Sequence, residues 1–125
     1  MELFNQEQQE PTILVVDDNQ DAALLLSRIL QIKGYKVHTV YGGLQAIKVA
    51  EDLRPKVIIM DLSMPVMDGF ETAQLLRQKS WGKDIMLIAL SGHSHDEDKE
   101  MSRLSGFDTH LAKPVDWASL ISLLS

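Results

Sequence analysis

Five short apolar stretches, most of them rich in β-branched residues, recur along the chain. They are Ile13 to Val16, Val37 to Tyr41, Val57 to Met60, Ile85 to Leu90, and a weaker one around His110 to Ala112. Most are nearly continuous rather than alternating with polar residues, which is typical of strands covered on both faces, as in a parallel sheet. We therefore predict five buried strands.

Apolar residues at helical spacing fill the intervals between these stretches. The expected helices run from the capping residue Asn19 to Gly34, from about Leu44 to Leu53, from about Phe70 to Lys79, from about Asp96 to Ser105, and from about Trp117 to Leu124. The first is expected to bury a face that includes Ala22 and Leu26. In the fourth, Met101 and Leu104 are the large apolar residues that we expect to anchor it, with little burial.

Five strand-helix units in alternation predict right-handed crossovers and one α/β domain, a five-stranded parallel sheet with helices on both faces. A chain of 125 residues without an internal repeat or linker fits a single domain. We expect residues 12–125 to form it and residues 1–11 to be a flexible lead-in. A functional site in such a sheet is expected at the carboxyl ends of the strands.

Composition and charge exclude several functions. The net charge of -6 argues against direct nucleic-acid binding, which normally uses a basic patch. The longest apolar stretches are strand-sized, and the polar, acidic start resembles no secretory signal, so we expect a cytoplasmic protein without membrane insertion. The chain has no cysteine, so disulfide and thiolate chemistry are absent.

Polar residues that could carry chemistry stand at four of the predicted strand ends. They are Asp17 and Asp18 after the first strand, Asp61 at the end of the third, Ser91 at the end of the fourth and Lys113 at the end of the fifth. Because these strand ends share one rim of the sheet, three carboxylates are expected to cluster there. Mg²⁺ prefers such oxygen ligands, and Asp18, Asp61 and the backbone carbonyl of Ser63 are the natural candidates.

The same rim predicts phosphoryl chemistry. Lys113 can pair with a phosphoryl oxygen as a point charge, and the Ser91 hydroxyl can donate a hydrogen bond to another. Positive charge arranged around an acidic side chain is what transfer of a phosphoryl group onto a carboxylate requires. Asp61 is the expected nucleophile.

The chain resembles the receiver domain of bacterial two-component response regulators. The resemblance covers about residues 12–125 and rests on four motifs in order along the chain. These are Asp17-Asp18, Asp61 within the segment Met60 to Gly69, the run Ala89-Leu90-Ser91-Gly92, and Lys113-Pro114. It implies a flavodoxin-like sheet with the strand order 2-1-3-4-5.

By the same resemblance, the chain takes a phosphoryl group onto Asp61 from a phosphohistidine donor, a histidine kinase or a histidine phosphotransfer protein. Mg²⁺ or Mn²⁺ is the implied cofactor, with Asp17 beside the metal. The domain would catalyse its own phosphorylation and dephosphorylation without being an enzyme of multiple turnovers. Segment 106–116 looks most like receivers attached to hybrid histidine kinases.

The resemblance also implies a switch. Ser91 would move toward the phosphoryl group, and the residue three positions before Lys113 would turn inward. That residue is commonly Tyr or Phe, whereas here it is His110, whose imidazole adds pH sensitivity. The fourth helix, fifth strand and fifth helix would then shift to control a downstream protein or an attached output domain. The resemblance also suggests a homodimer that depends on phosphorylation. The Lys113-Pro114 bond is expected to be cis.

Two other functions are considered for a site with acidic residues at these strand ends. One is a Mg²⁺-dependent phosphohydrolase with an aspartyl-phosphate intermediate, but there the nucleophile ends the first strand in an Asp-x-Asp motif, where this chain has Asp17-Asp18-Asn19. The other is a flavodoxin-type nucleotide binder, which needs a loop of Ser, Thr and Gly after the first strand to hold a phosphate. Here Asp17 and Asp18 would repel the phosphate.

Overall fold

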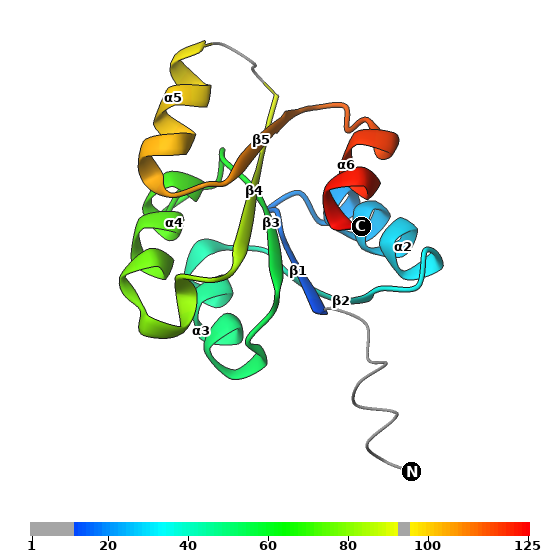
Figure 1. The fold of residues 1–125 in the computed structure, drawn as a ribbon, viewed down its shortest axis with the longest axis horizontal. Coiled ribbons are helices and arrows are strands. Elements are labelled where there is room, and N and C mark those ends of the chain that lie inside the picture. The colour runs from blue at the N-terminus through cyan, green and yellow to red at the C-terminus, as the bar shows by residue number, and fades with distance from the viewer. Residues whose placement is uncertain (1–11, 93–95) are drawn as a thin grey trace.

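A computed structural model describes residues 12–92 and 96–125, with the side chains of 96 and 97 left out (Figure 1). The five strands form one parallel sheet in the order β2-β1-β3-β4-β5, which confirms the predicted fold and strand order. The strands are β1 (Thr12–Val16), β2 (Lys36–Val40), β3 (Val57–Asp61), β4 (Met86–Ser91) and β5 (Thr109–Ala112). The predicted lead-in, residues 1–11, lies outside the described residues.

The helices cover both faces of the sheet. They are α2 (Gln20–Ile32), α3 (Gly43–Leu53), α4 (Gly69–Gln78), α5 (Asp96–Ser105) and α6 (Trp117–Leu124), with a short 3-10 turn η1 (Ser80–Gly82) after α4. Figure 1 shows α2 and α6 on one side of the sheet and α3, α4 and α5 on the other. Each boundary agrees with its prediction within about two residues, which is the usual scatter at helix ends.

The sheet separates two apolar clusters because successive side chains of a strand point to opposite faces. On β1, Leu14 and Val16 face the cluster beneath α3 and α4, whereas Ile13 and Val15 face the cluster beneath α2 and α6. The five residues of β3 are all buried, as its continuous apolar sequence predicts. This double burial holds the carboxyl ends of the inner strands in fixed positions.

Two predictions about buried faces were wrong. Helix α2 buries Ala23 rather than Ala22, together with Leu26, Ser27 and Leu30, so its inner face is rotated slightly from the predicted one. In α5, Met101 and Leu104 do not anchor the helix, since they are 50% and 66% exposed.

Helix α5 is packed through small polar residues. Ser102 and Ser105 are the buried side chains of its described part, at 1% and 2% exposure, and Ser102 Oγ donates to the Asp98 carbonyl at 2.8 Å. No described residue of α5 belongs to either apolar cluster. The described part of this helix therefore lacks the large apolar anchors that the hydrophobic pattern indicated, and its weak packing remains a prediction.

Across the described residues, no helix combines the length and the apolar character needed to cross a membrane.

Candidate functional site

The predicted acidic cluster forms at the carboxyl ends of β1 and β3. One carboxylate oxygen from each of Asp17, Asp18 and Asp61 lies within 4.8 Å of the other two. Asp17 and Asp61 are buried, at 5% and 6% exposure, whereas Asp18 is exposed. A set of hard oxygen donors that close together, with one face open, fits a divalent cation that keeps several of its waters.

Backbone contacts fix the positions of the two buried carboxylates. The Asp17 amide donates to the Val40 carbonyl at 3.2 Å, which continues the β1-β2 pairing past the end of β1. Its side chain accepts from the Asn19 amide at 3.0 Å, and Asn19 in turn caps α2. The strand therefore ends where the helix begins, and Asp17 is held at the junction.

The end of β3 is held by the start of α4. Asp68 is the N-cap of α4 and forms a capping box with Glu71. A Cβ on Gly69 would lie 2.8 Å from the Asp61 carbonyl oxygen, so only glycine lets the helix approach the strand this closely. The Ser63 amide donates to Asp61 Oδ1 at 3.3 Å. The predicted metal contact of the Ser63 carbonyl remains a prediction.

Lys113 reaches the cluster from the end of β5. Its Nζ lies 3.4 Å from Asp17 Oδ2 and 3.4 Å from Asp61 Oδ1, with 32% of the side chain exposed. The Lys113 amide donates to the Ser91 carbonyl at 2.8 Å, and the Lys113-Pro114 bond is cis, as expected. One ammonium is thus shared between two buried carboxylates, which leaves the cluster with excess negative charge.

Burial raises the pKa of Asp61, and the nearby negative charge of Asp17 adds to this effect. Lys113 and the Ser63 amide lower the pKa of the same carboxyl but do not cancel the rise. The ionised form of Asp61 is therefore held in an unfavourable environment. A cation or a group that removes its charge would relieve that cost.

Ser91 ends β4 at 6% exposure. It lines a cavity of about 320 Å³ together with Ser63 and Met64 of the loop after Asp61. Asp68, Phe70 and Asp98 of α5 also line this cavity. The structure therefore brings together the predicted residues Asp17, Asp18, Asp61, Ser63, Ser91 and Lys113 at one rim.

His110 lies on β5, two residues before Ala112, which pairs with Ser91 in the sheet. It is partly buried, and its Nε2 atom is buried without a hydrogen-bond partner among the described residues. Burial lowers the pKa of His110, Lys99 on α5 lowers it further, and Asp98 partly offsets this. The imidazole is therefore kept neutral near pH 7.

We expect His110→Phe to reduce the sensitivity of the protein to mild acid. A histidine with a lowered pKa in the folded state takes up protons preferentially when unfolded, so stability is lost as the pH falls below about 6.5 and through the folded pKa. Urea unfolding at several pH values should show that the free energy of unfolding falls less steeply toward acid pH for His110→Phe than for the wild type. The exposed His38, replaced by Phe, is the control, and identical profiles for wild type and His110→Phe would contradict the assignment.

Arg77, which no sequence pattern indicated as important, ties together the loops that precede β4 and β5. Its guanidinium donates to the carbonyls of Gly82, Ile85 and Gly106 at 2.8, 2.8 and 2.9 Å, and to Asp108 Oδ2 at 2.9 Å. An arginine in the last turn of an amphipathic helix is ordinary in sequence. No local pattern indicates that its partners lie up to 31 positions away.

The family model of the response regulator receiver domain matches residues 13–125. The chain belongs to this family. It is a receiver domain of two-component signalling, as the sequence motifs predicted.

Three similar proteins place the receiver among its relatives. The transcriptional regulatory protein PrrA of Mycobacterium tuberculosis is 35% identical over 112 residues, which are 90% of this chain and 47% of PrrA, so the chain spans about half of that relative. Sporulation initiation phosphotransferase F of Bacillus subtilis is 33% identical over 83% of this chain and 82% of that protein. A solved structure of the receiver domain of sensor histidine kinase PA1611 from Pseudomonas aeruginosa has magnesium in its active-site cleft. It superposes on this chain with a TM-score of 0.85 and is 33% identical in sequence, over 92% of this chain and 94% of that chain.

Proposed function

We propose that the receiver accepts a phosphoryl group on Asp61 from a phosphohistidine donor. The observation that carries the proposal is the shared ammonium: Lys113 lies 3.4 Å from both Asp17 and Asp61, which are buried and close together. Asp61 is then the nucleophile, and Lys113 and Ser91 would contact phosphoryl oxygens. The donor is a histidine kinase or a histidine phosphotransfer protein.

Asp17, Asp18, Asp61 and the Ser63 carbonyl would hold Mg²⁺, or Mn²⁺ in its place. The raised pKa of Asp61 and the exposed carboxylate of Asp18 support this, because the cluster has more negative charge than Lys113 balances. The magnesium ion in the cleft of the similar PA1611 receiver is a further support. A bound cation would supply charge neutralisation, while Lys113 would orient one phosphoryl oxygen and Ser91 would donate a hydrogen bond to another.

The surface formed by α5, β5 and α6 is proposed to change on phosphorylation and to contact the downstream partner. Helix α5 is held by Ser102 and Ser105 rather than by large apolar contacts, so it can shift at low cost. Met101 and Leu104 are already exposed on it, which gives a downstream protein, an attached output domain or a second receiver an apolar contact. Ser91 and His110 are the proposed link between Asp61 and this face.

The test of the proposal is intact-mass measurement after incubation with acetyl phosphate and Mg²⁺, because this small donor needs no partner protein. One added phosphoryl group is expected, and it should be absent when EDTA replaces Mg²⁺. Rapid turnover of diverse phosphoesters would instead identify the phosphohydrolase and overturn the proposal. A protein that shows neither an adduct nor turnover would also overturn it.

A further inference from the structure

A cavity of about 610 Å³ opens at the amino ends of the strands, at the edge of the sheet opposite the acidic site. Its floor is a row of three residues, Ile13, Val57 and Met86, which are register neighbours on β1, β3 and β4. The residues that follow each of these three along its strand are buried. We call this cavity the amino-edge groove.

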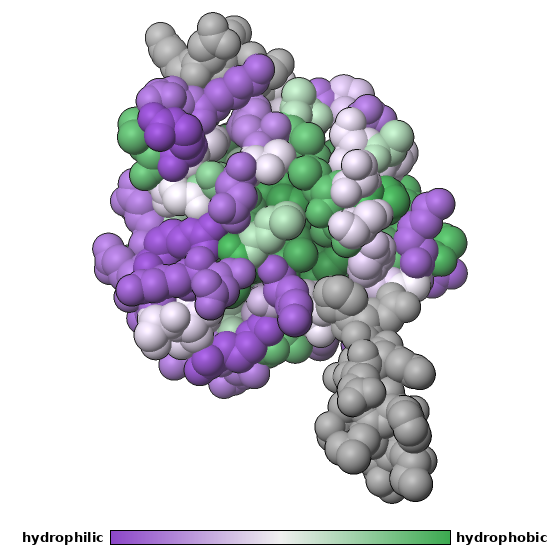
Figure 2. Space-filling model, in the orientation of Figure 1, coloured by the Kyte–Doolittle hydropathy of each residue, from purple (hydrophilic) through white to green (hydrophobic). Residues whose placement is uncertain are grey.

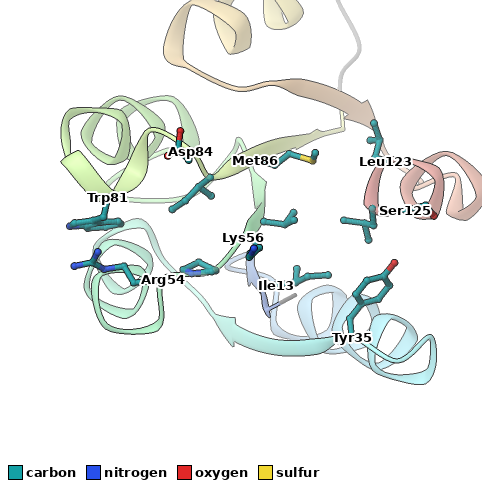
Figure 3. Close-up of a pocket in the computed structure, with 13 residues that line it drawn as sticks. Ile13, Tyr35, Arg54, Lys56, Trp81, Asp84, Met86, Leu123 and Ser125 are labelled. Carbon is teal, nitrogen blue, oxygen red and sulfur yellow. The ribbon is translucent and has the colours of Figure 1, made fainter. Parts of the chain in front are cut away.

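The groove lies where the two apolar clusters meet solvent. Trp81 and Ile85, which pack on the cluster beneath α3 and α4, form one wall, while Tyr35, Leu123 and Leu124 from the other cluster form the opposite wall. Figure 3 shows Trp81 on one side, Tyr35 and Leu123 on the other, and Ile13 and Met86 between them. On the face drawn in Figure 2, hydrophobic surface gathers between the helical layers, with hydrophilic surface around it.

Charges at the rim of the groove are mainly positive. Arg54 and Lys56 are exposed there, with Arg54 stacked 5.1 Å from the Trp81 ring centroid, and Asp84 is the acidic side chain of the described rim. No described residue fills the groove. The apolar lining offers a contact surface for a further segment, and the rim favours an acidic apolar occupant.

The segment that precedes β1 has these properties. It enters the sheet at Thr12, one residue before Ile13 of the floor, and it contains Leu3 and Phe4 together with three glutamates, Glu2, Glu7 and Glu10. Phe4 lies eight residues before Thr12, and eight extended residues span up to about 26 Å. The segment is therefore long enough to turn back and bring Phe4 near Ile13 on the floor of the groove.

We propose that Leu3 and Phe4 of the chain's own N-terminal segment dock in the amino-edge groove, with the segment's glutamates facing Arg54 and Lys56. Docking would be by side chains, because β1 already pairs with β2 and β3 and offers no free edge for a further strand. A second copy fits less well, since symmetric pairing across this surface would bring the rims with Arg54 and Lys56 together.

Trp81 on the groove wall reports docking directly. In a Trp117→Phe background, Trp81 is the remaining tryptophan. The double substitution Leu3→Ser with Phe4→Ser should shift its emission to the red and increase its quenching by acrylamide, because the indole becomes hydrated. The matched control, Asn5→Ser with Gln8→Ser in the same segment, should leave both signals unchanged. The Trp81 indole resonance in ¹⁵N spectra gives the same comparison without replacing Trp117.

Three results decide the proposal. A shift in the Leu3/Phe4 variant but not in the control supports docking, and Lys56→Glu should then reproduce part of that shift. Equal Trp81 signals in the wild type and the Leu3/Phe4 variant would overturn the proposal and favour the flexible lead-in predicted from the sequence. Protection of Trp81 that rises with protein concentration would identify a second copy as the occupant and would also overturn it.

Discussion

The Asp61→Asn variant should take no phosphoryl group from acetyl phosphate and should be more stable than the wild type in the absence of Mg²⁺. Asparagine keeps the shape of the side chain and can still accept from the Ser63 amide. It removes a charge that burial and Asp17 make unfavourable. At pH 7 we expect a gain of about 1 kcal/mol or more, the scale on which a poorly compensated buried polar group is felt.

The pH dependence of this gain has a definite sign. The folded pKa of Asp61 is raised above its ordinary value of 3.8, so the cost of ionisation is absent below that value and appears as the pH rises through the folded pKa. The difference between the two proteins should therefore shrink toward pH 4. Urea unfolding across this range measures it, and a variant less stable than the wild type at pH 7 would contradict the electrostatic account.

Magnesium should make the wild type more stable than Asp61→Asn, the reverse of the order expected without the metal. A ligand that binds only the folded state at 100 times its Kd stabilises by about 2.7 kcal/mol, and the wild type should show this gain while Asp61→Asn shows less of it. Asp68→Asn is the matched control, because asparagine caps helices as well as aspartate does and Asp68 lies outside the acidic cluster. This control should keep both the adduct and the response to Mg²⁺.

Arg77→Met should cause the largest loss of stability. The substitution keeps most of the apolar stem but leaves the carbonyls of Gly82, Ile85 and Gly106 without their guanidinium donor. Asp108 Oδ2 loses the guanidinium but keeps the Leu87 amide as a donor. Each unsatisfied buried group costs about 1 to 3 kcal/mol. We expect a total loss of about 3 kcal/mol or more, a large part of the stability of an ordinary domain.

The control for Arg77 is Arg103→Met on the exposed face of α5, where the pair with Glu100 is open to solvent and should contribute little. Arg77→Lys should recover only a small part of the loss, because an ammonium cannot serve several acceptors in the geometry of a planar guanidinium. Urea midpoints for the four proteins give the comparison. Equal midpoints for Arg77→Met and Arg103→Met would show that the loops hold without the guanidinium.

The strands, the helices and the edge that carries the acids could be predicted from local patterns. Continuous apolar runs indicate buried parallel strands, and the strand ends then place Asp17, Asp61, Ser91 and Lys113 on one rim without knowledge of any contact. The structure brings these residues together. Their roles in phosphoryl transfer remain predictions, since geometry alone does not test them.

The faces of the helices were predicted less well, because the partner surface decides which side is buried. In α5 the pattern favoured Met101 and Leu104 as anchors, whereas close packing selects Ser102 and Ser105, small enough to fit against the neighbouring elements. A hydrophobic pattern describes the residues of one helix. It does not describe the space available beside it.

The chain's local order of apolar and polar residues was sufficient for the α/β fold and for the acidic rim centred on Asp61, because strand length and side-chain alternation act over a few residues. The sharing of Lys113 between Asp17 and Asp61, the Arg77 network and the amino-edge groove come only from the tertiary structure. These features join residues that are far apart in the chain, so their energies depend on distances that exist only after the sheet and its two helical layers have packed.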